Sequence, residues 1–151
     1  VGRPEQLMDL ATLVFRDFTP DDAEAVVALW QACGLTRPWN DPRKDIARKM
    51  TDRNGAFWVV AHSGEIVASV MIGYDGHGGS INYLAVTPEA QAKGLGGELM
   101  RRAETYLIGL GCPKVSFGVR KDNLPVLSFY DQLGYDIDDV HFLGKRLIPD
   151  D

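Results

Sequence analysis

A glycine-rich stretch opens a long amphipathic helix pattern. The stretch reads Gln-Ala-Lys-Gly-Leu-Gly-Gly from Gln91 to Gly97, and the helix pattern continues to Leu110. The first N–H groups of a helix lack partners within the helix and lie at the positive end of its dipole, so anions bind there. Glycines let the backbone approach a bulky anion, and Lys93 adds a positive charge. These residues predict a loop that binds phosphate groups.

Three kinds of anion-binding loop place glycines at a helix start. The Walker loop needs G-x-x-x-x-G-K followed by Ser or Thr, and this string is absent. The dinucleotide fingerprint needs a third glycine where this sequence has Leu99. The acyl-CoA pattern, Gln or Arg followed by x-x-G-x-G, is matched by Gln91, Gly94 and Gly96. An ordinary glycine-rich turn is the alternative that the loop alone leaves open.

A second group of residues follows a predicted strand. Asn123 precedes a helix pattern, and Tyr130 lies about two helical turns later, so both side chains can face the same end of the sheet. From Asn123 the sequence reads N-L-P-V-L-S-F-Y-D-Q-L-G-Y. With the glycine loop, this stretch resembles the GCN5-related N-acetyltransferase (GNAT) family over about residues 15–135. Within that family the sequence is most similar to the bacterial YpeA-type acetyltransferases. The stretches that carry this similarity are R-P-W-N-D-P from Arg37, G-Y-D-G-H from Gly73, G-C-P-K from Gly111 and L-G-K-R-L from Leu143.

The resemblance implies roles for residues that match the family motifs. Tyr130 is expected to protonate the departing thiolate, with a core tyrosine as the alternative. Asn123 is expected to reach the pantetheine or the outer part of the cofactor, or to cap its helix. Backbone amides before and within the loop are expected to bind the pantetheine arm and the pyrophosphate of acetyl-CoA. These are the amides of Leu84, Ala85, Val86, Gln91, Ala92, Lys93, Gly94, Leu95, Gly96 and Gly97.

The acceptor half of the site is less defined. Many relatives have a glutamate on the strand before the loop, but Ser80, Asn82 and Leu84 offer no carboxylate here. The ribosomal-protein acetyltransferases have a glutamate five residues before the asparagine, where this sequence has Gly118, which counts against that activity. The base therefore remains open between Asp75, His77 and an ordered water, and His77 is also interpreted as a surface residue. Residues in the loop between the first two helices are expected to line the acceptor pocket, or to pack on their own domain. These residues are Trp39 and Asn40.

The hydrophobic patterns predict a mixed α/β (α+β) fold with a mainly antiparallel sheet flanked by helices, in the order β-α-α-β-β-β-α-β-α-β. The helices are expected from Thr19 to Gly34 and over residues 43–52, 94–110 and 123–133. The strands are expected over residues 13–18, 56–61, 66–74, 80–86 and 114–119, with one or two more in 135–147. Along 80–86, Ile81, Tyr83 and Ala85 are expected to alternate against Asn82, Leu84 and Val86.

Composition agrees with one domain. We expect a flexible leader over 1–10 and a single acyltransferase domain over 11–151, because 151 residues with 45% hydrophobic content suit one core. A net charge of -5 argues against a nucleic-acid partner. Cys33 and Cys112 form no metal or redox motif, and no apolar run is long enough to span a membrane. A cytoplasmic location with reduced thiols is therefore expected, with a homodimer through the last predicted strands as an option.

The sequence thus predicts an acetyl-CoA-dependent N-acetyltransferase that transfers the acetyl group to a primary amine by direct attack in a ternary complex. The acceptor is a small molecule or a peptide. One alternative is a domain of the same fold that binds or senses acyl-CoA without catalysis, and the missing strand carboxylate favours it slightly. Another is a nucleotide-phosphate binder.

Overall fold

The structure is a computed structural model that describes residues 9–151. Four strands form one antiparallel sheet in the order β1-β2-β3-β4. They are β1 (Leu13–Asp17), β2 (Ala56–His62), β3 (Glu65–Tyr74) and β4 (Gly79–Val86). The helices are α1 (Ala23–Ala32), α2 (Pro42–Met50), α3 (Leu95–Gly109) and α4 (Leu124–Gln132), with short 3-10 turns at Leu10–Thr12, Pro20–Asp22 and Pro88–Ala90. The mixed α/β class and the mainly antiparallel sheet are confirmed.

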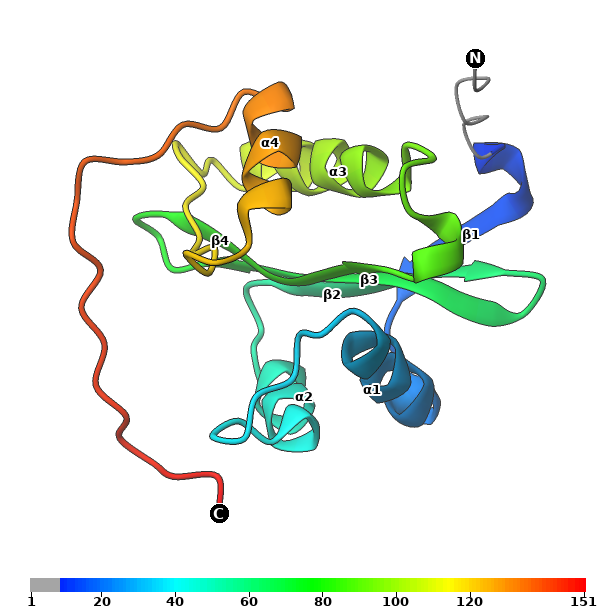
Figure 1. The fold of residues 1–151 in the computed structure, drawn as a ribbon, viewed down its shortest axis with the longest axis horizontal. Coiled ribbons are helices and arrows are strands. Elements are labelled where there is room, and N and C mark those ends of the chain that lie inside the picture. Colours follow the sequence, from blue (N-terminus) through cyan, green and yellow to red (C-terminus); the bar gives the residue numbers. More distant parts are fainter. Residues whose placement is uncertain (1–8) are drawn as a thin grey trace.

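The sheet lies between two layers of helices, with α3 and α4 on one face and α1 and α2 on the other (Figure 1). Successive side chains of a strand point to opposite faces, so each strand contributes to both cores. Val60, Val70 and Ile72 pack toward α3, whereas Val59 and Met71 pack toward α1 and α2. Both faces of the sheet are therefore covered.

The first helical segment begins after Thr19, as expected, with the 3-10 turn Pro20–Asp22 that leads into α1. The backbone N–H of Thr19 donates to Asp22 Oδ2 at 2.9 Å, and Pro20 occupies the first turn. Both guanidinium nitrogens Nη1 and Nη2 of Arg16 donate to Asp22, at 2.7 and 2.8 Å. Asp22 thereby ties the end of β1 to the start of the helical layer.

The strand expected over 114–119 is not formed as a ladder. Val115 makes one isolated parallel bridge to Gly79, and the segment then leaves β4. Aromatic side chains explain the departure, because Phe117 turns toward α4 and packs against Tyr130 and Tyr135, with ring centroids 4.7 and 5.3 Å apart.

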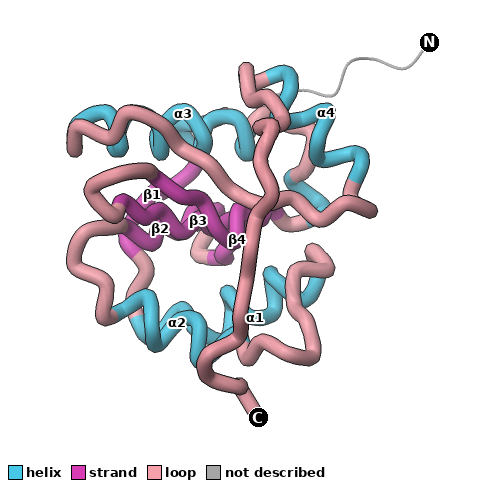
Figure 2. The backbone as a smooth tube through the Cα atoms, turned by 90° about the vertical axis from the view of Figure 1, so that its left-hand side faces the viewer, coloured by secondary structure: helices cyan, strands magenta, loops and turns pink. Residues whose placement is uncertain are grey.

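The strands expected in 135–147 are also absent. After Tyr135 the chain runs as an irregular extended segment, which we call the extended segment (residues 136–149). It passes from the α4 layer across the end of the sheet to the α1–α2 layer (Figure 2). Side chains on it are exposed, and it has no neighbouring strand to pair with among residues 9–151. A strand pattern without a pairing edge cannot satisfy its backbone as a sheet.

The expected alternation along β4 is wrong at one point. Ile81 faces α3 together with Leu84 and Val86, whereas Tyr83 and Ala85 face α1. The pairing with β3 shifts register here, with Ser69 opposite Ala85 and Met71 opposite Asn82. A β-bulge adds one residue to one strand, which exchanges the two faces beyond it.

Most of the expected leader, residues 1–8, lies outside the described residues. Leu10 belongs to a 3-10 turn whose start is capped by Asp9. Both cysteines are free thiols. In the described part of the chain, no helix combines the length and the apolar character needed to cross a membrane.

We predict that Asp22 makes the fold sensitive to acid. Hydrogen bonds from Arg16, followed by those from Thr19, lower the pKa of Asp22 from 3.8 to about 2. A lowered pKa in the folded state means that this stabilisation is present above the unfolded pKa and is lost as the pH falls toward about 2. Asp22→Asn should lower the free energy of unfolding by about 1–2 kcal/mol at pH 7, and the gap should narrow below about pH 4.

Urea unfolding at several pH values measures the free energy of unfolding of both proteins. Asp21→Asn, at the exposed neighbouring carboxylate, is the matched control. A gap between Asp22→Asn and the unchanged protein that stays constant down to low pH would contradict the prediction.

Candidate functional site

β4 is an edge strand for most of its length. Gly79 donates its N–H to Lys114 O at 2.8 Å and accepts from the N–H of Ser116 at 3.0 Å. No further bridge joins β4 to this segment in the part of the chain that is described. In Figure 1 the segment is yellow and lies beside the start of β4. The outer side of β4 from Ser80 to Val86 therefore has no strand partner, and the three predicted pantetheine residues lie along this open edge.

The glycine loop joins the end of β4 to α3 in a tight, irregular path. Gln91 folds back and donates Nε2 to Val86 O at 2.8 Å. Ala92 has φ +61° and Gly94, the N-cap of α3, has φ +88°. Gly94 suits this left-handed backbone because it has no Cβ, whereas Ala92 is strained there. The structure thus brings Gln91 to Gly97 together in one turn at a helix start.

The first turn of α3 is arranged to receive an anion. The first backbone hydrogen bond within this helix runs from Glu98 N to Gly94 O at 3.1 Å. The N–H groups of Leu95, Gly96 and Gly97 come before it and have no acceptor within the helix. Lys93 is half-buried beside them. These groups can hold a phosphate without a metal ion.

Glu98 also lies in this first turn, but its charge is balanced. Arg101 Nη2 and Arg102 Nε each donate to its carboxylate at 3.0 Å. The hydrogen bond from Arg102, together with Arg101, lowers the pKa of Glu98. Two arginines and one glutamate leave this turn with a net positive charge, which favours an anionic ligand.

Gly96 has a packing role as well. A Cβ on Gly96 would lie 3.2 Å from Phe129 Cζ and 3.7 Å from Val86 Cγ2. Its missing side chain therefore lets α4 approach α3 and β4 at one point. This approach positions the aromatic residues of α4 beside the open edge.

Tyr130 lies in the core with only 9% of its surface exposed. Its ring lies 4.7 Å from Phe117 and 4.9 Å from Phe129, centroid to centroid. No hydrogen bond to its hydroxyl is present among residues 9–151, yet no fully buried polar side-chain atom there lacks a partner. The hydroxyl must therefore retain contact with solvent. Burial raises the pKa of Tyr130 to about 12, so the hydroxyl stays protonated at neutral pH.

Asn123 occupies the N-cap position of α4, but its side chain makes no capping hydrogen bond. Asn123 is therefore the N-cap residue by position, without the side-chain hydrogen bond of a capping asparagine. Its exposed amide remains able to bind a ligand.

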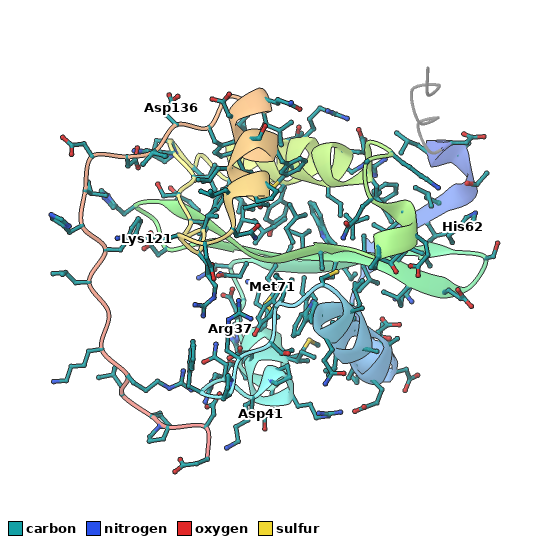
Figure 3. The ribbon with its side chains drawn as sticks, viewed as in Figure 1. Arg37, Asp41, His62, Met71, Lys121 and Asp136 are labelled. Atoms are coloured by element: carbon teal, nitrogen blue, oxygen red, sulfur yellow. The ribbon has the colours of Figure 1, made fainter. Side chains whose placement is uncertain are left out.

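The predicted acceptor residues of the α1–α2 loop lie at the end of the sheet. Trp39 is 56% exposed, and the guanidinium carbon of Arg120 lies 5.2 Å from its ring centroid. Asn40 Oδ1 accepts a hydrogen bond from Arg146 at 2.5 Å. Figure 3 shows Arg37, in this loop, at the same end of the sheet as Lys121. Segments from both helical layers therefore meet here.

Asp150 fixes the extended segment beside this loop. Its side chain is only 3% exposed and pairs with Arg48 at 2.6 Å and Arg146 at 2.9 Å. It also accepts the backbone N–H of Asp41 at 2.8 Å. The hydrogen bond from Arg48, then that from Asp41, lowers the pKa of Asp150.

Asp75 and His77 lie elsewhere. They are exposed in the turn between β3 and β4, where Asp75 Oδ1 accepts the N–H groups of His77 and Gly78 at 2.8 Å each. The turn precedes Gly79, whereas the glycine loop follows Val86, so the length of β4, roughly 23 Å, separates the two. The structure does not bring these two residues to the loop.

Sequence reasoning missed the residues that surround the bulge, which are Tyr83, Ser69, Trp30 and Asp45. A single sequence gives no sign that a tyrosine will adopt a positive φ, and the four residues are far apart along the chain.

Solved structures of N-acetyltransferases share this fold. The ribosomal-protein-S18-alanine N-acetyltransferase from Escherichia coli aligns with a TM-score of 0.69 at 19% identity, over 81% of this chain and 76% of that chain. The aminoglycoside acetyltransferase meta-AAC0020, from an uncultured soil metagenomic sample, aligns with a TM-score of 0.71 at 18% identity, over 91% and 99%. AAC(6')-Iy, solved with a bisubstrate analogue of CoA and acetylneamine, aligns with a TM-score of 0.70 at 14% identity, over 89% and 98%.

Residues 14–135 match the model of the acetyltransferase (GNAT) family. This match spans most of the chain, so the chain belongs to the GNAT family of acetyltransferases.

Proposed function

We propose that the protein transfers an acetyl group from acetyl-CoA to a primary amine, by direct attack within a ternary complex. The observation that carries this proposal is the open outer edge of β4, which ends at the glycine-rich start of α3. One linear ligand with hydrogen-bonding amides and a pyrophosphate matches both parts. The sequence stretches cited above support a YpeA-type member of the family.

The donor binds in two parts. The pantetheine arm adds to the edge of β4 at Leu84, Ala85 and Val86, as another strand would. The pyrophosphate binds the loop amides from Gln91 to Gly97, and Asn123 contacts the pantetheine or the outer part of the cofactor. The ion pairs of Glu98 with Arg101 and Arg102 support this assignment, because the two arginines offset the repulsion between this carboxylate and the phosphates.

Tyr130 donates a proton to the thiolate that leaves when the amine attacks. Its solvent contact and its unpaired, protonated hydroxyl support this role. A covalent intermediate on Cys33 is disfavoured, because burial raises the pKa of this thiol and its Sγ already contacts Val86 O at 3.2 Å. Oriented binding of both substrates supplies much of the acceleration.

The amine enters from the end of the sheet where Trp39 and Asn40 lie. An aromatic face and a carbonyl-type oxygen suit an amine, which would take the places that the guanidinium groups of Arg120 and Arg146 occupy here. The neighbouring Asp45 and Asp150 are both paired with Arg48. The remote position of Asp75 and His77 favours an ordered water as the first acceptor of the amine proton. A small-molecule amine is consistent with the aminoglycoside acetyltransferases named above.

A non-catalytic acyl-CoA-binding module is the second candidate. The side chains of β4 include no carboxylate, which favours it. Release of free CoA thiol from acetyl-CoA, measured against a panel of small amines, amino acids, aminoglycosides and lysine peptides, separates the two. Tight acetyl-CoA binding without thiol release on any amine would favour the module.

We predict that Gly96→Glu abolishes CoA binding. A carboxylate about 4 Å from a phosphate costs several kcal/mol at the dielectric of a protein surface, so the affinity should fall by more than about 100-fold. Isothermal titration calorimetry measures the affinity, and Gly109→Glu, at the other end of α3 with open space around it, is the matched control.

Gly96→Gln has a similar size without the charge and reports the cost of displacing Phe129. A folded Gly96→Glu variant that binds CoA normally would overturn the placement of the pyrophosphate.

We predict that Tyr130→Phe lowers kcat on the best amine of the panel by about 100-fold, because the acid is lost while the packing of the ring is retained. The Kd for CoA should change by less than about threefold. Tyr106→Phe, at a half-buried tyrosine that packs edge-on against Trp58, is the control. Unchanged turnover in Tyr130→Phe would rule out the proposed acid.

We also propose that two copies of the chain pair through the extended segment. Its apolar side chains are exposed, with 61% of Val140, 72% of Phe142 and 82% of Leu147 accessible. Strand-forming residues that lack an edge in their own chain find one in a second copy. Residues 117–120, which follow the single bridge of Val115 to Gly79 and join no strand among residues 9–151, offer such an edge.

We expect a dimer at micromolar concentration by size-exclusion chromatography with light scattering. The triple substitution of Val140, Phe142 and Leu147 by serine should give a monomer, since it removes the apolar surface. Ile108→Ser, on the exposed side of α3, should leave the dimer intact. A monomeric unsubstituted protein would contradict the proposal.

A further inference from the structure

The β4 bulge places a tyrosine in a backbone conformation that tyrosines avoid. Tyr83 has φ +52°, in the left-handed region. It shares the position opposite Val70 with Leu84, so neither has a one-to-one partner on β3. Such a conformation persists only where the surroundings stabilise it, and it often marks a functional position.

Two buried side chains hold the backbone of Tyr83. Trp30 and Ser69 are both fully inaccessible to solvent. Trp30 Nε1 donates to Ser69 Oγ at 2.9 Å, and Ser69 Oγ donates to the carbonyl oxygen of Tyr83 at 2.9 Å. The carbonyl of the bulge residue thus has a hydrogen-bond donor on a buried side chain.

The tyrosine side chain is held as firmly as its backbone. Its ring stacks on Trp30 with centroids 3.7 Å apart and an interplanar angle of 11°. Its hydroxyl donates to Asp45 Oδ2 at 2.6 Å, and Arg48 donates to the other oxygen of this carboxylate at 3.2 Å. Burial, followed by the neighbouring Asp45, raises the pKa of Tyr83, so the hydroxyl remains a donor. The bulge is therefore attached to α1, β3 and α2.

We propose that Tyr83, locked by Trp30, Ser69 and Asp45, is a positioning residue for acetyl transfer. The inference rests on the proposed function, in which the donor enters at the Val86 end of β4 and its acetyl end lies farther along the strand, toward the bulge. The bulge exchanges the two faces of β4, and this exchange directs Leu84 and Val86 toward α3 and α4, where Tyr130 lies. Removing a contact that holds the bulge should misplace the thioester of acetyl-CoA while leaving its pyrophosphate bound.

Tyr83→Phe and Ser69→Ala test the inference, with Tyr74→Phe as the matched control at the other end of the β3–β4 pair. Tyr83→Phe should lower kcat by about tenfold, and Ser69→Ala by more, because small misplacements of reacting atoms are costly. The Kd for CoA should stay within about threefold. The affinity preference for acetyl-CoA over CoA should shrink, because only the acetyl end is displaced.

Asp45→Asn keeps an oxygen that can accept the hydrogen bond from the Tyr83 hydroxyl, so this variant should retain most of the turnover. Asp45→Ala loses this acceptor and should lower kcat as Tyr83→Phe does. Unchanged kcat and unchanged ligand preference in Tyr83→Phe and Ser69→Ala would overturn the inference. A parallel loss of CoA affinity and melting temperature would overturn it too, since the role would then be structural. Failure of the unsubstituted protein to release thiol on any amine would instead refute the proposed function, and the ligand preference would still test the bulge.

Discussion

One additional residue in β4 determines which core each half of the strand joins. Before the bulge, the odd-numbered residue Ile81 faces α3. After the bulge, the even-numbered residues Leu84 and Val86 face the same helix. Regular pairing through Tyr83 would direct Leu84 and Val86 toward α1 instead. Three features depend on this exchange of the two faces of β4. They are the packing of α3 on the sheet, the path of the glycine loop and the approach of α4.

The glycine loop then meets two requirements at one place. A helix start that holds a phosphate needs small residues so that the ligand can approach the backbone. Gly96 meets this need and also leaves room for Phe129 of α4, 3.2 Å from where its Cβ would lie. Because one missing side chain serves both contacts, binding at the loop and the position of Tyr130 are physically linked.

Sequence patterns predicted the parts of the molecule that local chemistry determines. The helical segment from Thr19, the helix after Gly94 and the three strands β2, β3 and β4 depend on residues close in sequence, and the structure confirms them. The strands over 114–119 and 135–147 were predicted from the local hydrophobic pattern, but a strand also needs an edge to pair with. The bulge was missed because its supports at Trp30, Asp45 and Ser69 come from three other elements.

The donor and acceptor halves of the site also differ in how far apart their residues lie in the sequence. The loop of the donor half is continuous from Leu84 to Gly97, so one motif describes it. The acceptor half is assembled from segments about a hundred residues apart, through Arg146 on Asn40 and Asp150 on Arg48. Those contacts are ion pairs and hydrogen bonds between side chains, whose partners no short pattern specifies. An acceptor must therefore be inferred from the surface that these segments form, where the guanidinium carbon of Arg120 lies 5.2 Å from the ring centroid of Trp39.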